Sequence, residues 1–344
     1  MNKKYPIAFV FIVEYGDLEV KSTLLAESLR KFFPDNSRYP IYAVRPRKGK
    51  EISRETLNKF EDLHVTYIYK PINVLWKDLP FANEAYGSAI AEELLKDDAN
   101  ELVYIDSDVV LLKYPEQLLM PDNIKLLITP VDVSDSDAVK VGENVPDNWK
   151  FCYKLMNVDS KDLWTLHTKI DNIEIYPYFN SGLIVVRPEI GIFRGWREMF
   201  DISVKNGYFG IVNPFSKSFF FTDQLFLSTV IVSILKKDEI IILDNGYNFP
   251  LNYASQIFSK SGKIEINNIT FLHYHHSFYD MEWEKFINFN NTEGSWLISR
   301  LPLHKDLNTA RYRKKIEYIR QYLRFCFWRI KFKFNRNNIL LKEV

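Results

Sequence analysis

Two aspartates that follow an apolar run are the residues of this chain best placed to do chemistry. Asp106 and Asp108 come directly after residues 102–105, a run of four apolar residues typical of a strand covered on both faces. Ligands of open α/β sheets bind outside the carboxyl ends of such strands. The i, i+2 spacing aims both carboxylates the same way in an extended chain. Two hard oxygen donors side by side suit a divalent cation that keeps open positions for phosphate oxygens.

A second Asp-x-Asp triplet provides an internal comparison. Asp135-Ser136-Asp137 lies in a polar stretch with no apolar run before it. Because Ser and Asp favour helix caps and turns, we expect this copy to be a solvated loop or a helix start. The strand context therefore singles out Asp106 and Asp108.

Alternating strands and helices are expected to position these acids. The patterns predict strands at residues 7–13, 40–44, 65–69, 102–105, 125–129, 179–187, 240–244 and 269–273, and helices from Asp17 to Pro34 and at 81–95, 191–200 and 222–235. Alternation of β and α elements over the first 130 residues indicates a mostly parallel sheet with right-handed crossovers. The fold class is therefore α/β.

Residues 130–175 interrupt this alternation. They show no clear periodicity, are acidic and polar, and contain Trp149 and Trp164. Loops of that length in a compact domain are usually lids or binding segments. We expect this segment to act as a lid or to contact the acceptor.

Composition favours a soluble protein of one large domain, or of one domain with an extension. The chain has 344 residues, of which 47% are hydrophobic and 26% charged. Cys152 and Cys326 are far apart in the sequence, which argues against a disulfide scaffold or a thiolate zinc site and fits a reducing compartment. No apolar stretch is long enough to cross a membrane, so a cytoplasmic location is expected.

The charge of the chain is divided unevenly. Residues 311–342 contain 11 Lys/Arg and one acid, Glu317, which leaves a charge of −9 for the rest of a chain of net charge +1. Apolar and aromatic residues recur there at three- and four-residue spacing, as in helices that lie in a membrane interface. A basic helix packed on the acidic body is the alternative. We expect an anionic membrane surface rather than nucleic acid as the partner of this segment.

Five short segments occur in an order that resembles a known family. They are the first βα turn, Asp106-Ser107-Asp108 with its preceding helix and strand, Asn180-Ser181-Gly182, Asp223-Gln224, and His273-Tyr274-His275-His276. This order resembles the GT-A fold glycosyltransferases, most closely glycosyltransferase family 8, which includes bacterial lipopolysaccharide galactosyl- and glucosyltransferases and the glycogenins. The resemblance implies a GT-A domain over residues 1–285 and a helical, basic and aromatic extension over 286–344.

The resemblance also implies a metal site. Asp106 and Asp108 would bind Mn²⁺ or Mg²⁺ under a nucleotide diphosphate, with Asp106 also contacting the ribose and Ser107 lying beside the donor. His273 matches the third protein ligand of the family. A lone histidine is more often a packed or surface residue, and His275 and His276 are not expected to have a role.

Other segments resemble the donor-sugar site of the family. Asn180, Ser181 and Gly182 would lie beside the donor sugar, where Gly182 allows close approach of the backbone; a plain turn is the alternative. Asp223 would hold a sugar hydroxyl, and Gln224 would lie near the anomeric carbon; the alternative is a helix capped by the preceding threonine. Because a neutral amide is a poor nucleophile, a front-face displacement is easier to reconcile than a covalent intermediate.

Three departures from the family pattern concern the nucleotide. The family commonly carries acids and an Asn-Tyr pair after the first strand; here the segment is Val13-Glu14-Tyr15-Gly16-Asp17, which offers Tyr15 as a residue to stack on the base but leaves the identity of the base open. Asn83 and Glu84 stand where the family has a basic residue. The glycine and the diphosphate-binding lysine that follow the late histidine of the family are missing.

The predicted function is metal-dependent transfer of a hexose from a nucleotide-diphosphate sugar, a UDP-sugar, to a glycan. The acceptor is expected to be lipid-linked or a cell-surface polysaccharide or lipopolysaccharide, with retention of configuration, on the cytoplasmic face of a membrane. Two alternatives remain: a haloacid-dehalogenase-type phosphatase with Asp106 as nucleophile, or an inactive membrane-associated protein that binds nucleotide sugars.

Overall fold

The computed structural model describes residues 3–77, 79, 81–212, 216–279, 282–289, 292–301, 303, 316, 319 and 323. Its centre is a seven-stranded sheet in the order β10-β6-β9-β4-β1-β2-β3. The strands are β1 (Tyr5–Ile12), β2 (Ile41–Arg45), β3 (Val65–Tyr69), β4 (Ala99–Ile105), β6 (Leu126–Pro130), β9 (Phe179–Val186) and β10 (Ile240–Ile242). Only β9 runs antiparallel to its neighbours in this sheet. The predicted α/β class and mostly parallel sheet are confirmed.

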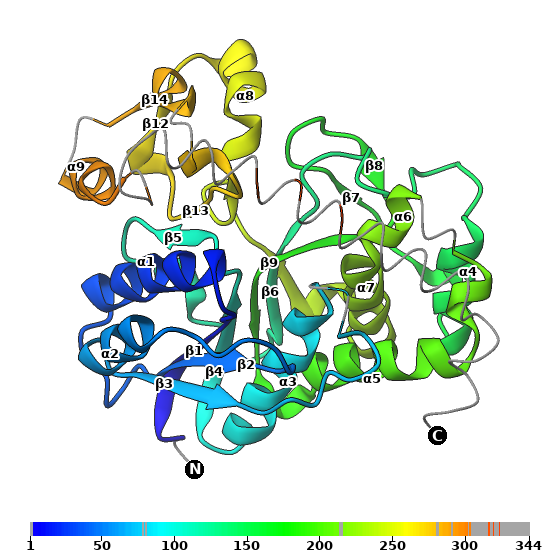
Figure 1. Cartoon of the computed structure of the whole chain (residues 1–344). Helices are drawn as coiled ribbons and strands as arrows, with labels where there is room; N and C mark the ends of the chain where they lie inside the picture. Colours follow the sequence, from blue (N-terminus) through cyan, green and yellow to red (C-terminus); the bar gives the residue numbers. More distant parts are fainter. Residues whose placement is uncertain are drawn as a thin grey trace.

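Helices cover both faces of the sheet (Figure 1). One face carries α1 (Asp17–Phe32) and α2 (Arg54–Asp62), and the other carries α3 (Ala82–Leu95), α5 (Ile192–Lys205) and α7 (Thr222–Ile234). Side chains alternate along β1, so that Phe9 and Phe11 pack with α1 and α2 while Val10 and Ile12 pack with α3. Burial on both faces explains why these strands are apolar throughout rather than at every second residue.

The strand order reverses beside β1. The chain proceeds from β1 outward to β2 and β3, and β4 then returns to the opposite side of β1. Neighbouring crossovers leave a crevice at the carboxyl ends of the strands on either side of such a switch point. Asp106 follows β4 and Tyr15 follows β1, so the structure places both at this edge, as the sequence predicted.

Residues 130–175 have more regular structure than their sequence suggested. They contain α4 (Asp147–Leu155) and a short antiparallel pair, β7 (Leu166–His167) and β8 (Glu174–Ile175). The prediction missed α4 because its buried residues, Trp149, Cys152 and Tyr153, span little more than one turn. Within the same segment Asp135 is exposed and pairs with Lys217 at 2.5 Å. The second Asp-x-Asp triplet forms a turn, as expected, but only Asp135 is solvated, since Asp137 is partly buried and accepts a hydrogen bond from the Ser218 hydroxyl.

A smaller sheet lies beside the main one, in the order β11-β13-β5. It is formed by β11 (Phe249–Pro250), β13 (Phe271–His273) and β5 (Val109–Leu111), and a satellite core joins it to α8 (Ala254–Ser261), β12 (Ile264–Glu265), β14 (Ile287–Asn288) and α9 (Thr292–Ser299). Ile287 and Leu297 are buried in this core together with Tyr274. The packed core therefore continues past residue 285, and the domain boundary proposed there stays a prediction.

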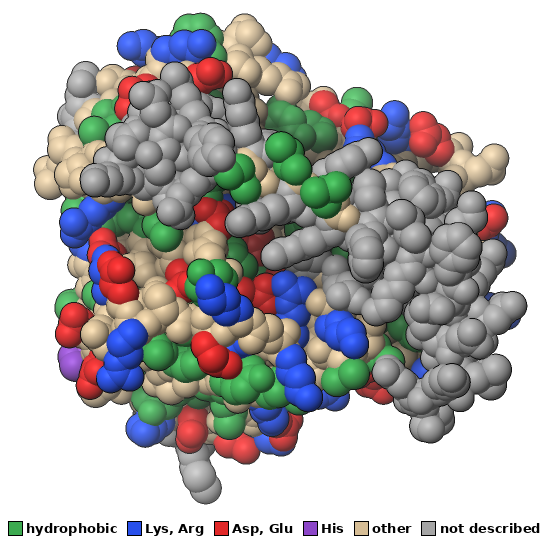
Figure 2. Space-filling view, in the orientation of Figure 1, with side chains coloured by type: hydrophobic (Ala, Val, Ile, Leu, Met, Phe, Trp, Pro, Cys, Tyr) green, Lys and Arg blue, Asp and Glu red, His purple; other side chains and the backbone are tan. Residues whose placement is uncertain are grey.

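Among the described residues, no helix is both long and apolar enough to span a bilayer. The basic segment 311–342 lies outside the described residues, apart from the isolated positions 316, 319 and 323. On the face shown in Figure 2, basic and acidic side chains are interspersed over the main body.

Candidate active site

The two aspartates lie on a tight turn that is fixed to both neighbouring strands. The amide of Val109 donates to the Asp106 carbonyl at 3.0 Å, and the Asp106 amide donates to the Gly182 carbonyl of β9 at 2.9 Å. The Ser107 hydroxyl donates to the Ile12 carbonyl at the end of β1. Ser107 was predicted to lie beside the donor. In the structure its hydroxyl donates a hydrogen bond that stabilises the turn.

His273 reaches this turn from β13. Its Nε2 is 3.1 Å from Oδ1 of Asp108 and 3.8 Å from Oδ2 of Asp106. β13 pairs antiparallel with β5 so that His273 lies opposite Val109, the residue after the acids. The structure therefore brings together the three residues that the resemblance proposed as metal ligands.

A relay of amides fixes which nitrogen of His273 faces the acids. The Gly182 amide donates to Oδ1 of Asn180 at 2.8 Å, and Nδ2 of Asn248 donates to the same oxygen at 2.8 Å. Oδ1 of Asn248 then lies 2.9 Å from Nδ1 of His273. Because an amide oxygen only accepts, Nδ1 must carry a proton, and Nε2 is the atom presented to the carboxylates.

Gly182 is required by the histidine. A Cβ at this position would lie 2.8 Å from Cε1 and Nδ1 of His273 and 2.9 Å from Oδ1 of Asn248. Gly182 was predicted to allow close approach of the backbone to a donor sugar. In the structure the same space holds the imidazole ring.

Buried acids converge on the turn from two further helices. Asp223, in the first turn of α7, accepts a hydrogen bond from the Ser181 hydroxyl at 3.1 Å. Burial, with the nearby Asp106 charge, raises the pKa of Asp223 to about 7. Burial and the charges of Asp106 and Asp223 likewise raise the pKa of Glu84 on α3 well above its ordinary value. Such crowding of negative charge favours a cation at this point.

The two acids of the triplet differ in their ionisation. Burial raises the pKa of Asp106 to about 6, and its Oδ1 accepts a hydrogen bond from the Tyr104 hydroxyl at 2.7 Å. Burial acts in the same direction on Asp108, but Lys21 and His273 outweigh it and hold the pKa of Asp108 well below its usual range. Asp108 is thus the permanently charged member of the pair.

Two buried lysines that the sequence analysis missed support the site. Lys21 on α1 lies 3.4 Å from Oδ2 of Asp108. Lys169, from the 130–175 segment, donates to the carbonyls of Tyr247 and Asn248 at 3.0 and 2.8 Å, and burial lowers its pKa to about 8. Neither lysine belongs to a recognisable motif. The only available signals were the position of Lys21 in the first helix and that of Lys169 in the 130–175 segment.

Two buried oxygens at the site have no hydrogen-bond partner in the part of the chain that the structure describes. They are Oε1 of Gln224 and Oε2 of Glu84. Buried acceptors are normally satisfied.

Tyr15 lies at the outer part of the crevice. Its ring is 48% exposed, with Nζ of Lys50 at 3.7 Å from the ring centroid. The preceding residue, Glu14, pairs with Arg47 and accepts a hydrogen bond from Asn83 at 3.0 Å. Stacking of Tyr15 on a base stays a prediction.

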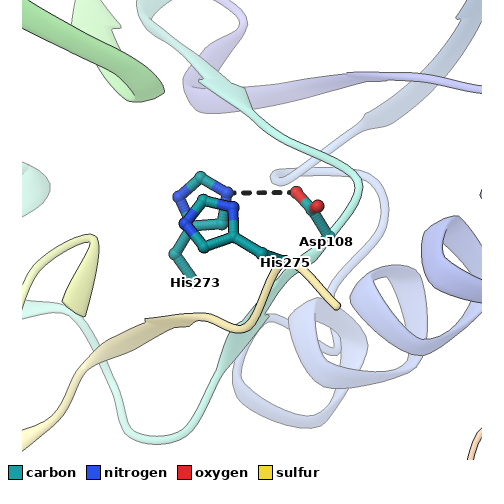
Figure 3. Close-up of side chains that lie close together, drawn as sticks. All are labelled: Asp108, His273 and His275. Atoms are coloured by element: carbon teal, nitrogen blue, oxygen red, sulfur yellow. Dashed lines mark hydrogen bonds and ion pairs between the residues drawn. The ribbon is translucent and has the colours of Figure 1, made fainter. Parts of the chain in front are cut away.

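Among the residues that the structure describes, one group of side chains has the spacing of metal ligands. Potential ligand atoms of Asp108, His273 and His275 all lie within 4.8 Å of one another (Figure 3). Asp106, the other predicted ligand, is outside this group but keeps Oδ2 near His273. Carboxylate and imidazole donors beside an excess of buried acid fit a divalent cation.

Comparison with known proteins places this chain in a class and then in a family. Residues 9–234 match the family described as the Rhodobacterales glycosyltransferase domain. The protein is therefore a glycosyltransferase, and it belongs to that family. The match ends before β13, so His273 lies outside the matched region. Assignment to family 8 is narrower and stays a prediction, whereas the phosphatase alternative is set aside.

Several solved glycosyltransferases have similar structures. The galactosyltransferase LgtC, crystallised with donor and acceptor sugar analogues, is 13% identical with a TM-score of 0.47, over 86% of this chain and 96% of that one. GlyE from Streptococcus pneumoniae is 16% identical with a TM-score of 0.48, over 92% and 64%. Core-mannan synthase A from Aspergillus fumigatus, in a Mn/GDP form, is 12% identical with a TM-score of 0.45, over 69% and 72%. No curated protein matches the chain.

Proposed function

We propose that the protein is a metal-dependent GT-A glycosyltransferase that moves a hexose from a UDP-sugar to a glycan, with retention of configuration. The observation that carries this proposal is the convergence of Asp106, Asp108 and Asp223 with His273 at the switch point of the sheet. Membership of a glycosyltransferase family supplies the reaction class. The arrangement of the site residues supports roles for them in binding the cation and the donor sugar.

Asp106, Asp108 and His273 would hold Mn²⁺ or Mg²⁺. When bound, the cation would neutralise charge on the departing nucleoside diphosphate. The chain prepares the site in two ways. Lys21 keeps Asp108 ionised, and Asn248 holds His273 with Nε2 toward the carboxylates.

The donor sugar would lie between α7 and β9. Oδ1 of Asn180 is already occupied, but its Nδ2 has only a 3.5 Å contact with Asp132, so this group is the one available to a sugar hydroxyl. Asp223 would accept from another hydroxyl, and the unpartnered Oε1 of Gln224 lies in the same helical turn. Since Gln224 is a neutral amide, a front-face displacement fits better than a covalent intermediate.

The acceptor would bind against the 130–175 segment, which contributes Lys169 and Asp132 close to the site. A lipid-linked glycan or a cell-surface polysaccharide is the proposed acceptor. The basic segment 311–342 would hold the enzyme on the cytoplasmic face of an anionic membrane.

The direct test is slow hydrolysis of nucleotide sugars in the presence of Mn²⁺ without an acceptor, read as release of UDP. Asp108→Asn is expected to lower this rate at least about a thousandfold, because it removes the ionised carboxylate of the site. Circular dichroism would verify that the variant folds.

Asp135→Asn is the matched control, since it changes the exposed copy of the same triplet. It should leave the hydrolysis rate unchanged. An Asp108→Asn variant that keeps near-full activity would refute the assignment of the cation site.

A further inference from the structure

We propose that His275 is an additional ligand of the cation and that it makes the site prefer Mn²⁺, Fe²⁺ or Co²⁺ to Mg²⁺. The inference rests on the proposed function only in requiring a divalent cation beside Asp108. It concerns a residue to which the sequence assigned no role. The evidence is the geometry of three side chains on two neighbouring segments (Figure 3).

The separations suit a single ion. Ligands about 2.1 Å from an octahedral ion lie about 3 Å apart when adjacent and about 4.2 Å apart when opposite. Nε2 of His273 and Oδ1 of Asp108 are 3.1 Å apart, and one ligand atom from each of these two residues and from His275 can be chosen so that all three lie within 4.8 Å of one another. Small side-chain rotations would therefore bring all three to one cation.

The backbone holds His275 in a costly conformation that keeps it at the site. Its φ of 47° is in the left-handed region, which is unfavourable for a residue with a Cβ. Tyr274 anchors the segment: its amide donates to the Asp108 carbonyl at 3.0 Å, and its carbonyl accepts from the Ser277 amide at 2.7 Å. Since Tyr274 is buried in the satellite core, the flanking histidines remain beside the acids.

The imidazole of His275 is available as a ligand. Its ring centroid lies 3.8 Å from that of His273. No hydrogen bond joins either of its ring nitrogens to the portion of the chain that the structure describes. A half-buried imidazole with unused nitrogens beside a carboxylate is a ready ligand for a metal ion.

A second imidazole changes which ion the site prefers. Mg²⁺ strongly prefers oxygen ligands, whereas Mn²⁺, Fe²⁺ and Co²⁺ accept imidazole with increasing affinity. One carboxylate and two imidazoles would leave positions open on the ion for diphosphate oxygens. Asp106 could fill one of these positions without displacing His275.

The test is titration of the full-length protein with Co²⁺, followed by the visible absorption of the bound ion, together with Mg²⁺ competition. His275→Phe keeps an aromatic ring beside His273 but removes both nitrogens, and His275→Asn tolerates the left-handed backbone. Each variant should lower Co²⁺ affinity at least tenfold and change the Co²⁺ spectrum, while Mg²⁺ affinity changes less than about threefold.

His276→Asn is the control, because it changes the adjacent histidine, which is outside the ligand group. It should leave Co²⁺ affinity and spectrum as in the wild type. Wild-type affinity and spectrum in both His275 variants would overturn the proposal and reduce His275 to a stacking partner. The cation site itself is judged separately: Asp108→Asn should abolish Co²⁺ binding whether or not His275 is a ligand.

Discussion

At the residue scale, the orientation of His273 depends on a neighbour that carries no charge. Asn248 is 1% exposed, has a φ of 55° and links Asn180 to His273 through its amide group. Lys169 donates to its carbonyl. Asn248 is thus a positioning residue, whose effect on the cation passes through the histidine.

Two substitutions at this position separate its roles. Asn248→Gly allows the left-handed backbone but removes the acceptor for Nδ1 of His273, and we expect cation affinity to fall about tenfold to a hundredfold. Asn248→Asp keeps that acceptor and should retain most of the affinity. Titration with Co²⁺ measures the cation affinity of each variant. Equal affinities in the two variants would contradict the positioning role of Asn248.

At the element scale, Glu92 of α3 acts as the missing cap of α5. The residue before α5 is Gly191, which has no side chain to accept the first amides of the helix. The Glu92 carboxylate accepts instead from the amides of Phe193 at 3.1 Å and Arg194 at 2.7 Å. This contact joins two helices that cover the same face of the sheet, next to the strand that carries Asp106.

The ionisation of Glu92 makes stability depend on pH. Burial raises the pKa of Glu92 from 4.5 to about 7, so the folded protein binds more protons than the unfolded chain between these values. Its contribution is therefore greatest below pH 4.5 and declines as the pH rises to about 7, by up to about 3 kcal/mol. Denaturant unfolding should show that the free energy of unfolding of the wild type falls relative to that of Glu92→Gln as the pH rises through this range. Plotted against pH, the two free energies should therefore converge or cross.

Glu93→Gln supplies the comparison at the neighbouring position, where the side chain is exposed and pairs with Lys96 at 2.8 Å. Between pH 4.5 and about 7, its free energy of unfolding should change with pH as that of the wild type does. If the free energy of unfolding of Glu92→Gln also shows the pH dependence of the wild type, the pKa of Glu92 is not altered by folding.

At the scale of the whole molecule, the site lies where the main sheet and the smaller sheet meet. Asp106 and Asp108 extend from the main sheet, whereas His273 ends a strand of the smaller sheet. The 130–175 segment contributes Lys169 to the junction. A cation bound there would therefore add a link between two sheets that already share a buried core, which includes Phe9, Val109 and Phe271.

Whole-molecule charge leads to a prediction about the membrane. Residues 311–342 carry a charge of +10, and each cation near an anionic surface contributes about 1 kcal/mol. The full chain should sediment with vesicles rich in phosphatidylserine at low salt, and a chain lacking residues 311–344 should stay in the supernatant. Phosphatidylcholine vesicles are the control. Unchanged binding after truncation would assign the basic segment a role within the protein instead.

Local patterns sufficed for the strands of the main sheet, for most of the helices that cover it and for the position of the acid pair. The strand that ends at Ile105 is apolar because it is covered on both faces, and Asp106 marks the point where it reaches the edge of the sheet. The order of motifs then pointed to His273 and Asp223. Periodicity and order are properties of the sequence itself, which is why these predictions agree with the observed fold.

Only the tertiary structure decided how the side chains meet. Lys21 and His273 lie 87 and 165 residues from Asp108, and their contacts depend on helix packing and on the register between β13 and β5. A shift of one residue in that register would turn His273 to the other face of its sheet. The requirement for Gly182 likewise arises only when the ring lies against it. The sequence specifies which ionisable and ligand side chains the protein has. The tertiary structure sets the distances between these side chains, and those distances determine their ionisation and their chemistry.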